Sequence, residues 1–406
     1  MELRGSASAG SRGDAVRSDV WVEIQRRESG GNEVALTGKA ADLFSRSTSE
    51  LVEHGLQFFG LEKVLVRIED SGALPFVLMA RLEAAVRRLW RDKEFPAWLP
   101  PPAPQTAASE RNHPRLSRLY LPGNNPKFMI NAPVHKPSGL ILDLEDSVAP
   151  SEKDAARVLV RNALVHLDFL GAEKIVRINQ GDYGLADLQW VVPYGVQLIL
   201  IPKVETSETV IQVATRIAEL RSEFSIDYPI WLMPIIESAK GAWFAYEIAS
   251  SHETVVALAI GLEDYTADIG AERTLEGRES FWARSQVLNA ARAAGVQPID
   301  TVFSDVADME GLRESVIEAK SLGFEGKGCI HPRQIEVIHQ AFAPSETELN
   351  KAKRIVRAYE DALSKGLGVI SLGSKMIDPP VLKRALRTIE SAEREGLIAH
   401  NWRQIE

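Results

Sequence analysis

WLMPIIESAKGAWFAYEIASSHETVVALAIGLEDYTADIG, residues 231–270, is the stretch that decides the fold. Its two short apolar runs, Trp231–Ile236 and Val255–Ile260, are separated by a segment of helical length. Runs of this length with a helix between them are typical of buried parallel strands joined by a crossover helix. The stretch therefore predicts an α/β fold built on a parallel sheet.

Acidic residues follow both runs. Glu237 comes directly after the first run, and Asp264 lies just beyond the second. Because the carboxyl ends of parallel strands share one edge, we expect these two side chains to lie close together. Two carboxylates without a nearby Cys or His favour Mg²⁺, which prefers oxygen ligands. The alternative is that both acids are solubilising groups at strand ends or helix N-caps.

The composition limits the class of protein. A chain of 406 residues is long enough for two domains, and 45% apolar with 25% charged residues excludes general disorder. A net charge of −9 disfavours nucleic acid as the main partner. The single cysteine, Cys329, fits a reducing compartment and packing as a small apolar side chain. Without a run of ~18 apolar residues or a secretory signal, we expect no membrane association and a cytoplasmic location.

The sequence divides into four segments. Residues 1–95 alternate strand and helix patterns like a small α+β domain, with a polar, Gly/Ser-rich arm expected to be mobile over 1–19. Residues 96–114 contain six prolines and predict a stiff spacer. Residues 115–343 form the main domain. Residues 344–406 contain a capping box from Ser345 to Glu348 and two amphipathic helices, which predict a helical arm that packs on a neighbouring subunit.

Short apolar runs alternate with helical stretches through the main domain. Together with the two opening runs they give eight strand candidates, the others being SRLYLPG at 117, GLILDLED at 139, KIVRIN at 174, QLILIPK at 197, PIDTVF at 298 and GKGCIHP at 326. Eight such units predict a (β/α)₈ barrel. A doubly wound open sheet is the alternative, but no Gly-rich dinucleotide fingerprint follows any of these runs.

Polar and ionisable residues collect where these strands are expected to end. They are Asp143, Glu145, Asp146, Arg177, Asn179, Lys203, Glu237, Asp264 and His331. The set predicts an anionic substrate held by Mg²⁺ and by cationic side chains. Structural roles are the alternative: helix caps for the aspartates, an ion pair for Lys203 and a turn for His331.

From residue 115 to about 395 the chain resembles the citrate lyase beta subunit and the related malyl-CoA and citramalyl-CoA lyases of the HpcH/HpaI aldolase superfamily. The matching stretches are RLYLPGNNP, LDLEDSVAPSEK, VRIN, IPKVE, IIES, GLEDYTADIG, PIDTVFSD, GFEGKGCIHPRQI and KMIDPPV. Residues 18–90 are similar to the acyl carrier (gamma) subunit of citrate lyase through SDVWVEI and EDSGALPFVLMARLEAA. The resemblance implies a fusion of a carrier module with a lyase module.

The resemblance also implies roles at the metal site. Glu237 and Asp264 become the Mg²⁺ ligands, and Arg177 faces the thioester and oxo-acid oxygens. Supporting roles fall to three further residues: Glu145, Asp146 and Lys203.

Other implied roles lie outside the metal site. Asn179, His331 and Pro332 are expected in the pocket for a pantetheine or nucleotide arm. Asp378 corresponds to an acid/base that reaches the active site of the adjacent subunit, in a trimer or a dimer of trimers. A simple helix N-cap is the alternative for Asp378.

The implied reaction is Mg²⁺-dependent cleavage of a citryl-like (3-hydroxy-3-carboxyacyl) thioester into a 2-oxo acid, such as oxaloacetate, and an acetyl thioester. The substrate would be carried on a CoA-like (phosphoribosyl-dephospho-CoA) group of the chain's own carrier domain, with an alpha-type acyltransferase subunit as a partner.

The carrier module departs from the family at the attachment position. The family's serine, two residues before the Asp-Val pair, is replaced here by Arg17. Attachment at Ser18 is favoured; Ser11 and an unmodified module are the alternatives.

Two other functions are possible interpretations of the sequence. One is a lyase or thioesterase that acts on free CoA thioesters, and the other is an inert subunit. The joint presence of Arg177, Glu237, Asp264 and Asp378 argues against inertness.

Overall fold

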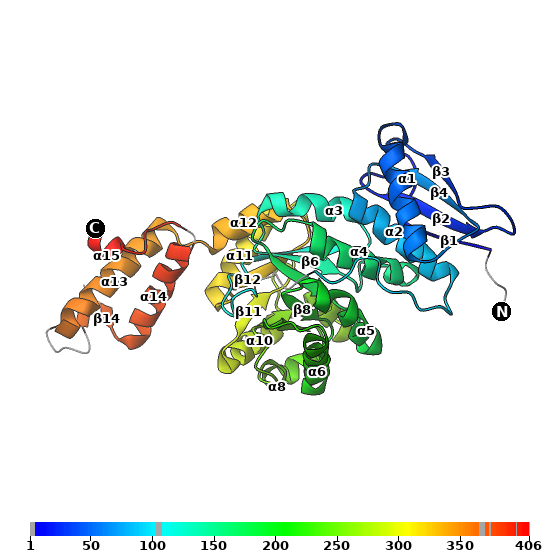
Figure 1. The fold of residues 1–406 in the computed structure, drawn as a ribbon. Helices are drawn as coiled ribbons and strands as arrows, with labels where there is room; N and C mark the ends of the chain where they lie inside the picture. The colour runs from blue at the N-terminus through cyan, green and yellow to red at the C-terminus, as the bar shows by residue number, and fades with distance from the viewer. Residues whose placement is uncertain (1–4, 103–107, 365–369, 373–374, 395, 406) are drawn as a thin grey trace.

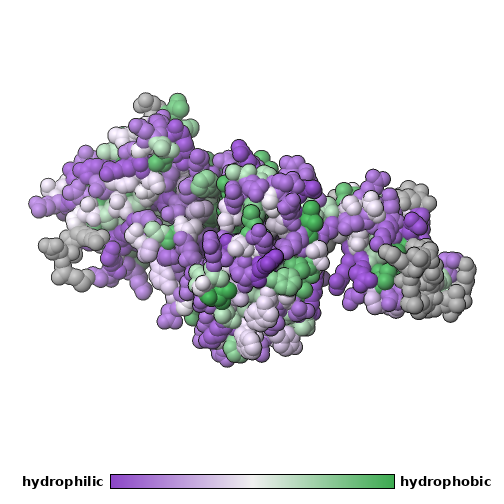
Figure 2. Space-filling view, turned by 180° about the vertical axis from the view of Figure 1, so that it is seen from behind, coloured by the Kyte–Doolittle hydropathy of each residue, from purple (hydrophilic) through white to green (hydrophobic). Residues whose placement is uncertain are grey.

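The structure, a computed structural model, describes residues 5–102, 108–364, 370–372, 375–394 and 396–405. Figure 1 shows a sheet-and-helix domain at the N-terminal side, a central barrel, and a helical arm on the other side of the barrel. The face in Figure 2 is mainly hydrophilic, with small separate hydrophobic areas. None of the described helices is long and apolar enough to cross a membrane.

The N-terminal domain is a four-stranded sheet in the order β1-β2-β4-β3, covered by two helices. Its elements are β1 (Ser6–Ala9), β2 (Val20–Arg26), β3 (Glu33–Thr37), α1 (Ala41–Phe58), β4 (Val64–Asp70) and α2 (Pro75–Leu89). The expectation of a mobile arm was wrong for Ser6–Ala9, which pairs antiparallel with β2. The small residues of this strand show no hydrophobic alternation that would predict it. The strand forms through backbone hydrogen bonds to β2, which the sequence pattern does not reveal.

All eight expected strands form one closed parallel barrel, which excludes the doubly wound alternative. The strands are β5 (Ser117–Pro122), β6 (Gly139–Asp143), β7 (Glu173–Arg177), β8 (Leu198–Ile201), β9 (Trp231–Ile236), β10 (Ala257–Ile260), β11 (Gln297–Asp300) and β12 (Gly326–Cys329). β12 pairs with β5 and closes the barrel. Side chains alternate along the strands: Leu140 and Leu142 pack under the helices, whereas Ile141 points into the barrel core.

The described helices of the barrel connect its strands and cover its outside. They are α3 (Pro126–Asn131), α4 (Lys153–His166), α5 (Gly181–Val191), α6 (Ser207–Glu223), α7 (Ala239–Trp243), α8 (Ala245–Ala249), α9 (Leu262–Asp268), α10 (Phe281–Ala294), α11 (Met309–Leu322) and α12 (Arg333–Phe342). Short 3₁₀ turns occupy Ala132–His135, Pro150–Glu152 and Val192–Tyr194.

The N-terminal domain is joined to the barrel where α2 packs against α4 (Figure 1). Ion pairs connect the two helices. Glu83 of α2 is fully buried and accepts hydrogen bonds from Arg161 of α4 at 3.0 and 2.7 Å. At the edge of the contact, Arg88 donates to Asp154 at 2.6 Å. Separating the two domains would break these pairs and leave Arg161 without its carboxylate partner, so the contact is a fixed interface.

A second connection reaches the loop that follows β5. Arg81 of α2 binds both carboxylate oxygens of Asp19 at 3.0 Å and donates to the carbonyl of Asn124 at 2.7 Å. Gly123 directly precedes Asn124 in this loop. Its amide donates to the carbonyl of Asp143 at 2.8 Å. The N-terminal domain therefore contacts the end of the barrel at which the strands terminate.

The C-terminal arm has a hydrophobic core of its own. Its elements are α13 (Glu346–Ser364), β13 (Ile370–Leu372), β14 (Lys375–Ile377), α14 (Pro379–Arg394) and α15 (Trp402–Ile405). Ile355, Ile389 and Trp402 belong to this core, which is separate from that of the barrel. The predicted capping box is confirmed: the Ser345 amide donates to Glu348 at 2.9 Å, and the Glu348 amide donates to Ser345 Oγ at 3.2 Å. The domain limits at 95, 114 and 343 stay predictions.

Candidate active site

A cavity of about 230 Å³ lies at the carboxyl ends of the barrel strands. We call it the barrel cavity, and it is lined by Arg118, Tyr120, Asp143, Ser147, Arg177, Ile235, Glu237, Ala259, Ile260, Gly261, Leu262, Glu263, Asp264, Asp300, Thr301, Val302, Gly328 and Ile330. In open α/β and barrel folds, ligands bind at this end of the strands. The barrel cavity is therefore the candidate active site.

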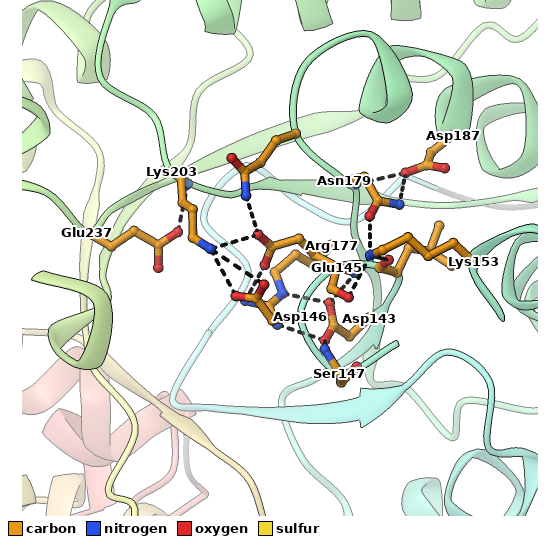
Figure 3. Close-up of polar contacts among 12 residues, drawn as sticks. Asp143, Glu145, Asp146, Ser147, Lys153, Arg177, Asn179, Asp187, Lys203 and Glu237 are labelled. Carbon is orange, nitrogen blue, oxygen red and sulfur yellow. Dashed lines mark hydrogen bonds and ion pairs between the residues drawn. The ribbon is translucent and has the colours of Figure 1, made fainter. Parts of the chain in front are cut away.

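Arg177, the last residue of β7, is held in a fixed orientation by two acids from the end of β6 (Figure 3). Its Nε and Nη2 atoms donate to the two oxygens of Asp143 at 2.6 and 2.7 Å, and Nη1 lies 3.0 Å from Glu145 Oε2. Burial opposes ionisation of Asp143, but the hydrogen bonds and charge of Arg177 outweigh it, so the Asp143 pKa is below its ordinary value. The charged guanidinium is thus held at the cavity wall.

Lys203, just after β8, contacts four acids. Its backbone has a φ of +50°, a left-handed conformation that is uncommon for a residue other than glycine. Its amide donates to Glu237 Oε1 at 2.7 Å, and its Nζ lies 3.1 Å from Asp146 and 3.3 Å from Glu145 (Figure 3). The same Nζ lies 3.6 Å from Asp264. One residue therefore orients one carboxylate through its backbone and the others through its side chain.

Glu237 is a buried carboxyl with an altered acidity. Burial, and then the charges of Asp264 and Glu145, raise the pKa of Glu237 to about 8, partly opposed by the Lys203 amide. The carboxylate has room because residue 261 is glycine: a Cβ there would lie 2.5 Å from Glu237 Oε2. The backbone of the β10–α9 connection thus comes close to this carboxylate.

The acids of the site suit a hard cation. Five carboxylates, of Asp143, Glu145, Asp146, Glu237 and Asp264, surround the two cationic groups of Arg177 and Lys203. Within the described residues, no group of three or more His, Cys, Asp or Glu side chains is arranged to hold a metal ion. Mg²⁺ commonly takes only one or two carboxylates and completes its shell with water and substrate. The Glu237–Asp264 pair, with its excess of negative charge, fits such an ion.

Asn179 lies behind the cluster of acids rather than on the cavity wall. Its Nδ2 donates to Asp187 at 2.8 Å, and its Oδ1 accepts from Lys153 (Figure 3). Lys153 also donates to the carbonyls of Leu144 and Glu145, both at 2.9 Å. Asn179 and Lys153 therefore fix the loop that carries Glu145.

His331 and Pro332 follow two residues of the cavity wall, Gly328 and Ile330, and lead into α12. His331 Nδ1 accepts from the Arg333 amide at 3.2 Å, a local turn contact. These two residues are thus close to the cavity in the chain but are not among those that line it.

Two further predicted site residues lie outside the barrel. Ser18 is half-buried in the N-terminal domain, with a φ of +58°, and its amide donates to the Ser71 carbonyl at 3.0 Å. Asp378 precedes α14 in the arm, where its Oδ1 accepts from the Val381 amide at 3.1 Å as a helix cap. No described contact joins either residue to the Glu237–Asp264 pair within one chain.

The prediction from sequence missed part of the cavity lining. Arg118, Tyr120, Asp300 and Thr301 were not among the expected site residues, although they line the barrel cavity. Polar residues inside otherwise apolar strand candidates were the available signal, because a buried polar side chain in a barrel strand needs a partner or a ligand. Cys329 is buried as expected, and burial raises its pKa to about 12, which makes it an unreactive thiol.

Comparisons with known proteins agree with this geometry. The family model described as HpcH/HpaI aldolase/citrate lyase matches residues 116–332, and one described as malonate decarboxylase delta subunit (MdcD) matches residues 7–89. A citrate lyase subunit beta from Haemophilus influenzae is 40% identical over 69% of this chain and 97% of its own length. A mitochondrial citramalyl-CoA lyase from Homo sapiens is 32% identical over 79% of this chain and 98% of its own length.

A solved structure extends the likeness to three dimensions. The protein CitE from Mycobacterium tuberculosis, in complex with magnesium, acetoacetate and coenzyme A, has 31% identity and a TM-score of 0.59 over 70% of this chain and 99% of its own. The family model covers more than half of the residues, and the relatives are covered almost completely. The chain therefore belongs to the HpcH/HpaI aldolase/citrate lyase family and is a lyase.

Proposed function

We propose that the chain is a Mg²⁺-dependent carbon–carbon lyase that cleaves a citryl-like thioester into a 2-oxo acid and an acetyl thioester. The observation that carries the proposal is the shared cavity, in which the fixed guanidinium of Arg177 faces the same space as the Glu237 and Asp264 carboxylates. The complexes of the M. tuberculosis relative with magnesium and coenzyme A support the choice of ion and of substrate class.

In this proposal Glu237 and Asp264 hold Mg²⁺. When bound, the ion supplies Lewis-acid polarisation of the hydroxyl and carboxylate oxygens of the substrate. The Lys203 amide keeps Glu237 turned toward the site, and the Lys203 ammonium moderates the repulsion among the surrounding acids. Lys203, Glu237 and Asp264 follow the ends of the neighbouring strands β8, β9 and β10.

Arg177 stabilises the enolate oxygen that forms when the carbon–carbon bond breaks. A guanidinium has five N–H donors. Two of those of Arg177 bond to Asp143, and its Nη1 lies within ion-pair distance of Glu145. The remaining donors are available to a thioester oxygen, and one well-placed donor contributes about 3–4 kcal/mol to transition-state stability. Asp143 and Glu145 thus position a donor that itself contacts substrate.

Asp378 is proposed as the acid that protonates the enolate carbon in a neighbouring subunit. Within its own chain it belongs to an arm with a separate core, and that arm extends away from the barrel (Figure 1). An arm of this kind suits a closed homo-oligomer based on a trimer, in which each subunit completes the site of the next. Its capping contact with Val381 leaves Oδ2 available for proton transfer.

The proposal also gives the N-terminal domain a role: it carries the thioester substrate. The match of residues 7–89 to a carrier-type family supports it, as does the position of Ser18, directly before the Asp19 that Arg81 connects to the loop after β5. A CoA-like group on Ser18 would start close to the barrel cavity, and an alpha-type acyltransferase subunit would load it. His331 and Pro332 are proposed to flank the arm, whereas Asn179 supports the loop that carries Glu145.

A lyase that uses free CoA thioesters is the second candidate. The human relative named as a citramalyl-CoA lyase favours it, and so does Arg17 at the family's attachment position. Both candidates use the same barrel cavity, so they differ only in how the thioester arrives.

Two measurements test the proposal. Natively expressed protein, analysed by intact mass and by peptide mapping of residues 5–30, should carry a CoA-like mass on Ser18 or Ser11; a bare chain would leave only the free-CoA candidate.

The rate of Mg²⁺-dependent cleavage of a citryl thioester should fall at least about 100-fold in Asp264→Ala, because a metal ligand is lost. The exposed control Glu276→Ala should retain activity. Near-normal turnover of Asp264→Ala at saturating Mg²⁺ would remove the metal assignment.

A further inference from the structure

Arg118 is a charged residue inside the barrel. It is the second residue of β5, its exposed fraction is 1%, and it lines the barrel cavity. Along β5 the side chains of Leu119 and Leu121 pack under the helices, so Arg118 and Tyr120 point inward. Arg118 pairs with Gly139, four residues before Asp143, so its Cα lies about 13 Å from the level of Asp143, measured along the strands. It therefore forms part of the cavity floor.

The other fully buried cations around the barrel have carboxylate partners. Arg115 binds Glu173 at 2.7 Å, Lys327 binds Asp300 at 2.8 Å, and Arg161 binds Glu83. Arg118 differs, because among the described residues it has no carboxylate within ion-pair distance. Its Nη1 donates to the sulfur of Met233 at 2.9 Å, and its buried Nε has no hydrogen-bond partner. A buried guanidinium in this state is strongly unfavourable unless an anion joins it.

The walls around Arg118 do not offer that anion. Its strand neighbours in register are Gly139 and Gly328, which have no side chains. The carboxylate whose charge acts on Arg118, Glu173, is already bound by Arg115. Asp300 of the cavity wall is shared by Lys327 and Arg284. Burial lowers the pKa of Arg118 from its ordinary value, and the charges of Tyr120, Cys329 and Glu173 only partly offset this effect. The missing partner must therefore enter through the cavity.

The cavity limits the size of that partner. At about 230 Å³ it is smaller than the roughly 300–1,000 Å³ of pockets for drug-sized ligands, so it suits a small acid rather than a nucleotide. One end of the cavity carries the Glu237–Asp264 pair and Arg177, and the floor carries Arg118. An acid with an anionic group at each end matches this arrangement.

We propose that Arg118 forms an anion subsite for the far carboxylate of a dicarboxylic 2-oxo acid, and of the thioester that yields it. The inference rests on the proposed lyase function and specifies its substrate class. A monocarboxylic oxo acid leaves the buried guanidinium unpaired, whereas a four-carbon diacid pairs with it. Sites built to bind a polar group discriminate strongly against analogues that lack it. Arg118 thus selects a citryl-type substrate over a citramalyl- or malyl-type one.

Binding of two oxo acids that differ by one carboxylate tests the subsite. Titration of the full-length protein with freshly prepared oxaloacetate and with pyruvate, in saturating Mg²⁺, should show a preference for oxaloacetate of at least about 100-fold. Arg118→Met should reduce this preference to below about tenfold and leave pyruvate binding within about twofold, while Arg118→Lys should retain part of it. An unchanged preference in Arg118→Met would overturn the proposal.

Stability supplies a readout that does not depend on turnover. Without ligand, Arg118→Met should unfold at the same or a higher urea concentration than the parent chain, because an unpaired buried charge is replaced by an apolar side chain. Arg284→Met is the matched control, and it should be destabilised because it leaves Asp300 with one partner fewer. Equal destabilisation of both variants would show a structural arginine and reject the subsite.

The outcomes separate this proposal from the proposed function. Mg²⁺-dependent binding of both acids without discrimination would reject the subsite alone and leave the lyase proposal in place. Absence of Mg²⁺-dependent binding of either acid would reject both.

Discussion

Gly261 limits where the Glu237 carboxylate can lie, because a side chain at residue 261 would meet it at 2.5 Å. We predict that Gly261→Ala lowers Mg²⁺ affinity about 10–100-fold without changing any ligand, as residues that orient metal ligands commonly do. Calorimetric titration with Mg²⁺ measures the effect. Gly31→Ala is the control, since a Cβ there meets nothing within 4 Å. Equal affinities of the two variants would contradict the expected crowding.

The raised pKa of Glu237, about 8, predicts how Mg²⁺ binding depends on pH. Below that pKa the carboxyl is protonated in the metal-free protein, and a proton must leave before it can bind a cation. The apparent affinity should therefore fall about tenfold per pH unit below pH 8 and level off above it. Titrations at pH 6, 7, 8 and 9 test this. Glu237→Gln should bind weakly and without this slope, and a flat profile in the parent chain would argue against Glu237 as a ligand.

At the scale of single residues, sequence reasoning found the side chains that end a strand. Arg177, Lys203, Glu237 and Asp264 all follow apolar runs, and the structure brings them together. Arg118 was missed, although a charged residue inside an apolar run was a signal, because its role depends on the inward direction of its side chain and on the glycines beside it. Neither property is visible before the strand register is known.

The α2–α4 contact gives a prediction at the scale of elements. Glu83 accepts hydrogen bonds from Arg161, Arg87 and the Trp98 amide in a fully buried setting. Glu83→Ala leaves Arg161 buried without its partner, so the free energy of unfolding should fall by about 3–5 kcal/mol. Urea denaturation measures it. The exposed pair Arg216–Glu219 supplies the control: Glu219→Ala should change the same quantity by less than about 0.5 kcal/mol.

The elements themselves were largely predictable. The eight barrel strands are apolar runs bounded by turn or charged residues, and the capping box fixes the start of α13. β1 was missed, because the sequence SASA carries no hydrophobic alternation and its edge position depends on backbone pairing. The docking of α2 on α4 was missed as well, since ion pairs between residues 78 positions apart leave no local pattern.

At the scale of the whole molecule, the fixed interface predicts that the N-terminal domain acts without leaving the barrel. Replacing Arg88 and Asp154 by cysteines and joining them with a short bis-maleimide should leave turnover within about twofold of the uncrosslinked double variant. Cys329 does not interfere, because it is fully buried. If crosslinking abolished turnover, and cleavage of a cleavable linker restored it, the domain would have to move away from the barrel during the reaction.

The proposed contribution of Asp378 in trans predicts complementation between inactive subunits. Asp378→Asn and Asp264→Asn should each be inactive, yet mixed under conditions that exchange subunits they should recover about one quarter of parent activity, as random assembly around a closed ring requires. Activity assays after refolding of equimolar mixtures measure this. If the mixtures remained inactive although mass spectrometry showed mixed oligomers, Asp378 would have no role in a neighbouring active site. It would then act only as a helix cap through its contact with Val381.

The connection from Asp19 through Arg81 to Asn124 has a kinetic consequence in the proposed carrier role. A thioester mounted beside this connection meets its own barrel at an effective concentration that the fold sets, and dilution of the protein does not change it. Delivery is then a first-order event, whereas a separate carrier subunit would have to be found by diffusion. In that role, fusion and docking together would make the delivery of a loaded thioester independent of the concentration of the protein.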